Sequence, residues 1–178
     1  MKTNQKYIFI LLFGLVFSLL MQPTMARAVP VDSVHYMVSG NLERFEALKL
    51  KVEDRIDHVN QAYLTTIYNG NDLDLAGRWN IIFLERSIYR VKLGLALTLD
   101  LEQFKVGKGI GIAGEGQYLE QNKYFWETTY YFDRKMNWVY EGGIALPLTP
   151  TTFLTLSAGN TYWKPTDPVM SIGIKVEM

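Results

Sequence analysis

The sequence contains no cysteine, and its 178 residues include only two histidines, His35 and His58. An exported chain without cysteine has no disulfide bridge, so its stability must come from packing or from a membrane. Thiolate chemistry is excluded, and two histidines leave little material for a metal site or a general base. The formal net charge is zero, which gives a nucleic-acid partner no basic patch to bind. We therefore predict no catalytic residue, no metal, no cofactor and no nucleic-acid partner.

Long apolar runs are also scarce, and the first residues carry the longest one as part of a secretory signal. A basic start at Lys2 and Lys6 precedes an apolar run over 7–21, and Ala26-Arg27-Ala28 supplies small residues at the positions that a signal peptidase reads. The run is short for a membrane-spanning helix, which needs about 20 apolar residues. We predict a signal peptide over 1–28, with an uncleaved anchor as the alternative.

The next segment, 29–70, contains a predicted amphipathic helix at about 41–67. At 100° per residue its apolar side chains fall within an arc of about 120°. These side chains are Leu42, Phe45, Leu48, Val52, Ile56, Val59, Tyr63 and Ile67. Ser39-Gly40-Asn41 is a plausible start and Asn69-Gly70-Asn71 a plausible stop. The same residues nearly fit a heptad, so the helix could bind a protein partner or a second copy of the chain. Packing against the rest of the protein is the favoured use.

From Gly77 onward the period of the apolar residues changes from 3.6 to 2. Consecutive strands with brief connections predict an antiparallel up-and-down β-barrel over 71–178. We expect strands at about 77–86, 88–102, 109–119, 123–133, 135–147, 152–163 and 169–178. The clearest is 88–102, where one face is apolar and the other is small or charged.

Alternation alone allows two orientations. In a membrane barrel the apolar face meets lipid; in a soluble lipocalin-like barrel it points inward. Aromatic residues near the two ends of one face, such as Trp126 and Tyr130, resemble interfacial belts and favour the membrane. On alternate positions the apolar faces over 91–101, 124–132, 138–146 and 170–178 also carry no charge, and each Lys or Arg at mid-bilayer would cost about 2–4 kcal/mol. We therefore place the apolar face outward.

This orientation assigns two sets of side chains. Those predicted to face lipid are Val91, Leu93, Leu95, Leu97, Leu99, Leu101, Trp126, Tyr130, Trp138, Tyr140, Ile172 and Ile174. Those predicted to be charged groups of the barrel interior are Arg90, Lys92, Asp100, Glu102, Glu115, Glu127, Glu141 and Lys175.

The last eight residues resemble the last-strand signal of bacterial outer-membrane proteins. That pattern runs polar, any, Gly, any, any, hydrophobic, any, aromatic, and ends at the chain terminus. Ser171, Gly173 and Val176 match it, whereas Met178 stands where the family usually has Phe or Trp. The resemblance implies a small outer-membrane β-barrel of a Gram-negative cell envelope, surrounded by outer-membrane lipid and recognised by the outer-membrane assembly machinery.

Barrels of this class usually have an even number of strands. An eighth strand could come from Val34 to Val38 or from Ala62 to Tyr68, the latter shortening the helix. The predicted fold is thus mainly β, with about eight barrel strands preceded by one amphipathic α-helix. Eight strands enclose a space that their own side chains fill. We therefore predict a structural, anchoring or accessory role in an envelope assembly, without an open pore. The alternative is a soluble periplasmic barrel that binds an apolar ligand under a helical lid.

Two patterns that look like chemical motifs have structural explanations. The stretch Gly109-Ile110-Gly111-Ile112-Ala113-Gly114 satisfies G-x-G-x-x-G, but that motif works only where a strand turns into a helix, and here it opens a strand. Asp100 and Glu102 could join Glu115 or Glu127 as paired carboxylates for acid–base work. An ion-pair network with the basic residues of the same face is the favoured interpretation.

Overall fold

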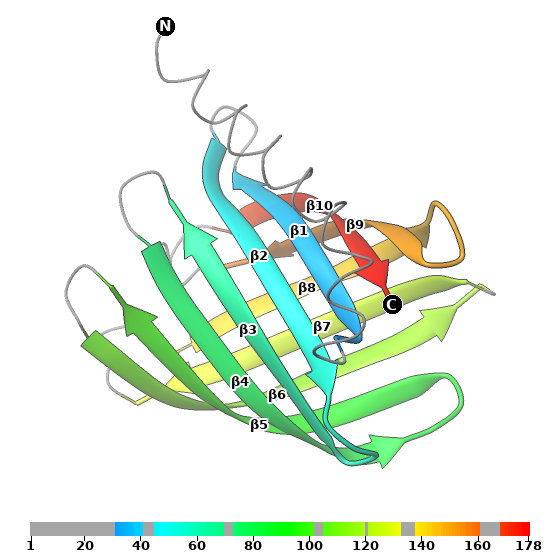
Figure 1. The fold of residues 1–178 in the computed structure, drawn as a ribbon, viewed down its shortest axis with the longest axis horizontal. Coiled ribbons are helices and arrows are strands. Elements are labelled where there is room, and N and C mark those ends of the chain that lie inside the picture. Colours follow the sequence, from blue (N-terminus) through cyan, green and yellow to red (C-terminus); the bar gives the residue numbers. More distant parts are fainter. Residues whose placement is uncertain are drawn as a thin grey trace, which may run out of the picture.

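In a computed structural model, the chain forms a closed antiparallel β-barrel (Figure 1). The structure describes residues 31–40, 45–69, 73–101, 105–119, 121–132, 138–160 and 168–178. Within these ranges ten strands are present. They are β1 (Ser33–Gly40), β2 (Phe45–Arg55), β3 (Asn60–Tyr68), β4 (Leu73–Glu85), β5 (Tyr89–Asp100), β6 (Lys105–Tyr118), β7 (Asn122–Tyr131), β8 (Trp138–Pro147), β9 (Thr152–Gly159) and β10 (Val169–Glu177). The part of the chain that is described holds no helix long and apolar enough to cross a membrane.

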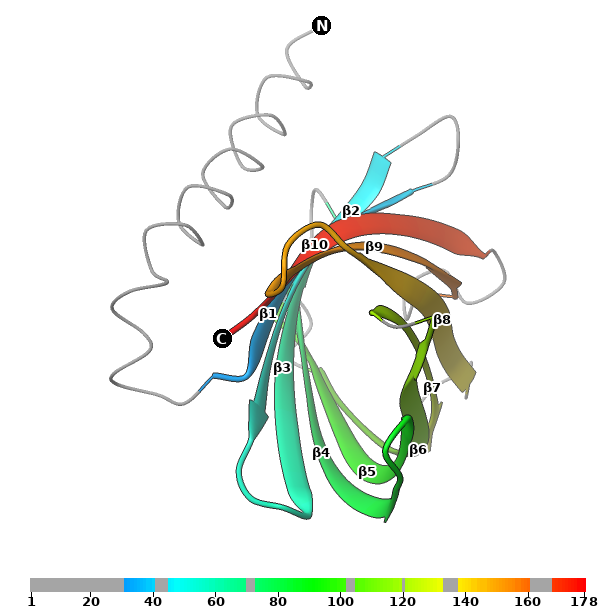
Figure 2. The same cartoon turned by 90° about the vertical axis from the view of Figure 1, so that its right-hand side faces the viewer.

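The barrel has the simplest up-and-down topology, because each strand pairs with its neighbours in sequence. The ring closes where β1 pairs with β10, with His35 opposite Lys175 (Figure 2). Closure leaves no free strand edge, so the backbone N–H and C=O groups along the ring are paired within the sheet.

Buried and exposed side chains alternate along the strands. The buried ones are mostly polar and the exposed ones mostly apolar, which is the reverse of a water-soluble protein. On β5, Lys92 is 5% exposed and Thr98 is 3% exposed, whereas Leu95 is 66% exposed. Because successive strand residues face opposite sides, charged and small side chains point into the barrel and large apolar ones point out. A soluble lipocalin-like barrel needs the opposite arrangement.

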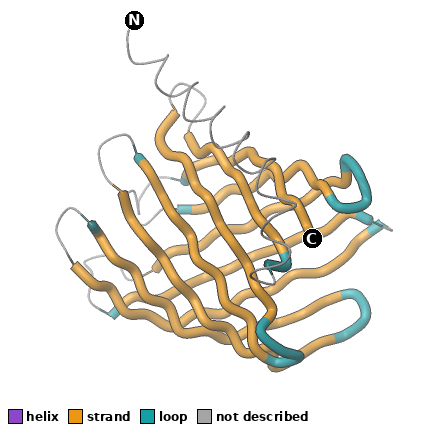
Figure 3. The backbone as a smooth tube through the Cα atoms, in the orientation of Figure 1, coloured by secondary structure: helices purple, strands orange, loops and turns teal. Residues whose placement is uncertain are grey.

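The two ends of the barrel differ in the length of their connections. Four turns of three or four residues, 56–59, 86–88, 119–121 and 148–151, lie at the end where β1 begins and β10 ends (Figure 3). The five connections at the other end, 41–44, 69–72, 101–104, 132–137 and 160–168, have four to nine residues. We call the first the turn end and the second the loop end.

The prediction of an amphipathic helix at 41–67 is wrong, because residues 45–67 belong to β2, a turn and β3. The spacing of Leu48, Val52 and Ile56 fits both periods, since residues four apart share one face of a helix and one face of a strand. The intervening Leu50 is the apolar residue that only a strand places beside them. The turn follows at Asp57, whose carboxylate accepts the Val59 backbone N–H at 2.7 Å.

The predicted strand number is also wrong. Both segments considered for an eighth strand are strands, β1 and β3, and β2 lies between them, which makes ten. The seven strands predicted after Gly77 correspond to β4–β10. The G-x-G-x-x-G stretch lies inside β6, paired on both sides, and has no helix after it. The signal peptide predicted at 1–28 lies outside the described residues.

Candidate functional site

The inside of the barrel is lined by charged side chains of both signs. A cavity of about 490 Å³ reaches the turn end, where Arg86, Ser87 and Ile88 help to line it. We call this cavity the vestibule. Its charged lining consists of seven basic and six acidic residues: Lys51, Arg55, Arg86, Arg90, Lys92, Lys123, Lys175, Asp32, Glu53, Glu115, Glu127, Glu141 and Glu177.

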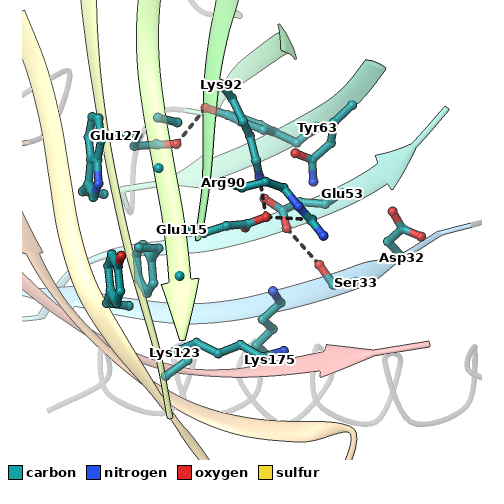
Figure 4. A pocket seen from close by; sticks show the side chains of 18 of the residues that line it. Asp32, Ser33, Glu53, Tyr63, Arg90, Lys92, Glu115, Lys123, Glu127 and Lys175 are labelled. Carbon is teal, nitrogen blue, oxygen red and sulfur yellow. Dashed lines mark hydrogen bonds and ion pairs between the residues drawn. The ribbon is translucent and has the colours of Figure 1, made fainter. Parts of the chain in front are cut away.

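Ion pairs hold many of these groups against the vestibule wall (Figure 4). The Glu115 carboxylate forms ion pairs with the Lys92 ammonium, at 2.9 Å, and with the Arg90 guanidinium, at 3.0 Å. The Lys123 ammonium on β7 lies 2.7 Å from the Glu177 carboxylate on β10, although these strands are three positions apart around the ring. A lumen lined in this way offers many hydrogen-bond partners to water and polar solutes. It has no dry apolar surface on which an apolar ligand could bind.

Two ion pairs cross the lumen in the middle of the barrel. The Lys51 ammonium on β2 lies 3.5 Å from the Glu127 carboxylate on β7. Beside it, Lys49 on β2 lies 3.2 Å from Glu141 on β8. In a ring of ten, β2 and β7 are five strands apart in either direction, so the first pair spans the full width. We call these four residues the crossbar.

Further contacts fix the crossbar. The Tyr63 hydroxyl donates to Glu127 at 2.9 Å, and the Lys51 ammonium lies 3.9 Å from the centre of the Tyr63 ring. The Ser157 hydroxyl donates to Glu141 at 2.6 Å. Charge-assisted hydrogen bonds of this kind are among the stronger polar contacts in proteins.

A second, smaller cavity of about 80 Å³ shares three of the four crossbar residues with the vestibule, and the fourth, Lys49, lines only the smaller cavity. Lys51, Tyr63, Glu127 and Glu141 line both, whereas Asn160 at the start of a loop-end connection lines only the smaller one. The crossbar therefore stands between two hollow parts of one lumen. The arrangement is that of a narrow polar passage interrupted by ion pairs.

Arg78 on β4 is a fixed cation behind the crossbar. Its side chain is only 1% exposed, and Nη1 lies 4.0 Å from a Glu127 oxygen. Nε donates to Asn80 at 2.7 Å and Nη1 to Thr129 at 3.2 Å. Gly111 makes room for the guanidinium, because a Cβ atom there would lie 2.9 Å from Nη2. Glu127 thus has cations on two sides.

The residues predicted to face lipid lie on the outward face. Leu93, Leu95, Leu97, Trp126, Trp138, Tyr140 and Ile172 are exposed, and Val91, Leu99, Leu101, Tyr130 and Ile174 are partly exposed. Tyr130 and Trp138 form an edge-to-face pair with ring centroids 5.1 Å apart.

The residues predicted to be interior charges fall into two groups. Arg90, Lys92, Glu115, Glu127, Glu141 and Lys175 line the vestibule. Asp100 is at the opposite end of β5 from Arg90, opposite Lys105, and Glu102 lies outside the described residues. The structure does not bring Asp100 to Glu115. It instead places Glu127 directly opposite Glu141 in the β7–β8 register.

Ser171, Gly173 and Val176 of the predicted assembly signal lie in the closing strand β10, and Met178 follows its end. Ser171 is buried inside, and its hydroxyl lies 2.7 Å from that of Ser39. Gly173 pairs with Met37 of β1, Val176 is half-buried, and Met178 is exposed at the turn end.

Much of the site was missed by sequence reasoning, because it lies before Gly77. The predicted helix at 41–67 places Lys49, Lys51 and Glu53 outside the barrel, although they alternate with Leu48, Leu50 and Val52 as strand residues do. That alternation is the signal that identifies them as lumen residues. The described residues contain no group of three or more His, Asp or Glu side chains that could hold a metal ion.

The chain resembles solved outer-membrane porins in fold. No family model matches its sequence, and neither does any curated protein. A KdgM porin structure aligns over 82% of this chain and 99% of the porin, with a TM-score of 0.58 and 8% identity. A NanC porin structure aligns over 83% of this chain and 100% of the porin, with a TM-score of 0.50 and 8% identity. The predicted class, a bacterial outer-membrane β-barrel, is confirmed at the level of fold.

The prediction of a barrel without an open pore is wrong. It rested on eight strands, which their own side chains fill, whereas ten strands leave the vestibule and the smaller cavity. The KdgM and NanC structures that share this fold are porins. The helix proposed as a docking surface or lid is absent from residues 45–67, so the roles assigned to it are wrong as well.

Proposed function

We propose that this protein is a narrow outer-membrane channel for small hydrophilic solutes, and that it has no enzymatic activity. One observation carries the proposal: a polar lumen with a vestibule of about 490 Å³ continues past the crossbar to a second cavity. A barrel that served only as an anchor would not need a hydrated, charged interior of this size. The crossbar makes the passage narrow.

The outward face supports the membrane part of the proposal. Leu95, Leu97 and Ile172 are more than half exposed, and burying them in hydrocarbon removes apolar surface from water. The shorter turns of outer-membrane barrels face the periplasm and the longer loops face outward. The turn end, with the vestibule, therefore faces the periplasm, and the loop end faces the cell exterior.

Export and assembly belong to the same proposal. Residues 1–28 act as a cleaved signal peptide, and Ser171, Gly173, Val176 and Met178 form the signal that the outer-membrane assembly machinery reads. Outer-membrane lipid is the surrounding partner.

A known ligand of a structural relative does not transfer directly. One KdgM porin structure, with a TM-score of 0.55 and 9% identity, is of a complex with a disordered oligogalacturonate. The vestibule of this chain carries nearly equal numbers of basic and acidic residues, so it offers no single-sign surface to a chain of carboxylates. Small solutes suit it better.

Planar-bilayer recording tests the proposal. The refolded protein should give small, discrete conductance steps in potassium chloride, and Lys51→Ala should enlarge them by removing one arm of the crossbar. Lys108→Gln, on the outward face of β6, is the matched control and should leave the steps unchanged. Heat-modifiable migration on gels checks that each barrel is folded. Folded protein that gives no steps, with or without the Lys51 side chain, would contradict the proposal.

A further inference from the structure

We infer that the channel selects small zwitterionic solutes, which carry one ammonium and one carboxylate group. This inference rests on the proposed channel function and specifies its substrate class. The reason lies in the crossbar, whose two ends bear opposite charges on opposite walls of the lumen. Lys49 and Lys51 extend from β2, and Glu127 and Glu141 extend from β7 and β8.

A solute can pass only if the crossbar separates. The Lys51 and Glu127 charged atoms are 3.5 Å apart, and those of Lys49 and Glu141 are 3.2 Å apart. These are contact distances, so no solute fits between them without moving a side chain. Lysine side chains, with four rotatable methylene groups, are the flexible members of the crossbar.

When the crossbar separates, Lys51 and Glu127 each keep other polar partners. Lys51 keeps Glu53, whose carboxylate lies 3.2 Å away on the same strand. Glu127 keeps the Tyr63 hydroxyl at 2.9 Å and the fixed Arg78 guanidinium at 4.0 Å. An unpaired buried charge would make opening very unfavourable. Glu127 keeps these two partners, which extend from β3 and β4, when the Lys51 side chain swings away, so the crossbar can open and close.

The attraction across the lumen is nevertheless lost when the crossbar opens, and solutes differ in how they replace it. The ammonium of a zwitterion meets Glu127 and Glu141 while its carboxylate meets Lys49 and Lys51. A neutral solute replaces neither contact. An anion or a cation is attracted by one wall and repelled by the other, so single-sign solutes are disfavoured.

The vestibule provides independent support. A lumen that concentrates anions is lined by an excess of cations, and the reverse holds for cations. Here the seven basic and six acidic residues leave almost no excess of either sign. Solutes without net charge therefore meet no electrostatic barrier on their way to the crossbar, and among them those with two charged groups gain most from it.

Swelling of proteoliposomes with four solutes of matched size tests the inference. The solutes are serine, a zwitterion; serinol, the cation in which a hydroxymethyl group replaces the carboxylate; glycerate, the anion in which a hydroxyl replaces the ammonium; and glyceramide, the neutral amide of glycerate. Serine should enter about fivefold faster than glyceramide, the ratio that corresponds to one ion pair of about 1 kcal/mol. Serinol and glycerate should be slowest.

Crossbar variants show whether the preference arises there. Glu127→Gln and Lys51→Met should each abolish the serine advantage, the first favouring glycerate and the second serinol. The double exchange Lys51→Glu with Glu127→Lys keeps both charges and should retain the advantage. Lys108→Gln outside the lumen should not change the ranking.

The possible failures are distinguishable. Folded protein without any ion conductance in planar bilayers refutes the channel function and, with it, this inference. Ion conductance with serine no faster than glyceramide refutes only the inference, as does a serine advantage that survives Glu127→Gln. If a variant does not fold, the ranking of the four solutes in the wild-type protein decides.

Discussion

Lys51 and Glu127 lie 3.5 Å apart although their strands, β2 and β7, occupy opposite sides of the ten-stranded ring. An ion pair between adjacent strands stabilises a local ladder, but this one joins opposite walls and occupies the passage. In the proposed channel this ion pair therefore affects both the stability of the barrel and the passage of solutes.

A double-mutant cycle on the crossbar pair should measure its direct contribution. Lys51→Met, Glu127→Gln and the double variant should give a coupling free energy of about 1 kcal/mol, because both side chains are largely shielded from water. Unfolding by urea in lipid vesicles provides the measurement. The same cycle on Arg55 and Glu85, a more exposed pair at the turn end, should give a smaller coupling. Equal coupling for both pairs would show that crossing the lumen adds no stability.

Closure of the ring depends on a close backbone approach at Gly173. A Cβ atom there would collide with the backbone oxygen of Tyr36 on β1, which cannot rotate away. Gly173→Ala should therefore destabilise the barrel by roughly 1–3 kcal/mol, as other overpacked substitutions do. Gly77→Ala is the control, because a Cβ atom at that position would lie 4.0 Å from its nearest neighbour, the Tyr63 oxygen.

The two glycine variants are compared by refolding yield and by heat-modifiable migration on gels. We expect a loss for Gly173→Ala and none for Gly77→Ala. Equal yields would mean that β1 and β10 can separate enough to accept a methyl group without loss of closure.

The outward orientation of the apolar face predicts a depth-dependent cost for charge. Leu95 lies in the middle of β5 and is 66% exposed, so Leu95→Arg should destabilise the barrel by about 2–4 kcal/mol in a bilayer. Ile56, in the turn after β2 and 58% exposed, lies near the interface, and Ile56→Arg should cost only about 0–1 kcal/mol. Unfolding in phospholipid vesicles measures both. Similar costs at the two positions would contradict the assignment of Leu95 to lipid.

The β-barrel could be predicted from residues after Gly77 because there the local pattern and the final structure agree. On β5, Lys92 and Thr98 face inward, and Leu95 and Leu97 face outward. Shifting the strand by one residue would exchange these faces, so the pattern determines the register strongly. The same argument indicated which charged residues would share the interior.

The segment before Gly77 could not be predicted as well, because its local signals are ambiguous. Leu48 and Val52 fit a helix face and a strand face equally, and what resolves the ambiguity is pairing of β2 with β1 and β3. β1 in turn pairs with the last strand of the chain, β10. Such long-range pairing is not visible in a window of neighbouring residues.

The crossbar depends on the strand count, which is why it escaped prediction. Glu127 was identified as an interior charge, but its partner follows from which strand lies opposite β7. With about eight strands and a helix at 41–67, Lys51 is not in the barrel at all. Only a ring of ten that includes β2 places Lys51 across from Glu127.

The β2–β3 turn should make barrel stability depend on acidity through Asp57. Hydrogen bonds from the Asn60 side chain and from the backbone N–H groups of Val59 and Asn60 lower the pKa of this exposed carboxyl below its ordinary value of 3.8. A carboxyl whose pKa is lower in the folded state stabilises that state when it is ionised. The contribution is therefore complete above the pKa of the unfolded chain and disappears as the pH falls through the lower, folded value.

Comparison with Asp57→Ala isolates this contribution from every other titrating group. The stability difference between the wild-type protein and Asp57→Ala should be constant above about pH 5 and should shrink as the pH falls below 3.8. Asp57→Asn keeps an oxygen that accepts the same N–H groups but does not titrate, so it should differ from Asp57→Ala by the same amount at every pH. Urea unfolding across this pH range provides the data. A wild-type difference that does not change with pH would show that the hydrogen bonds to Asp57 do not depend on its charge.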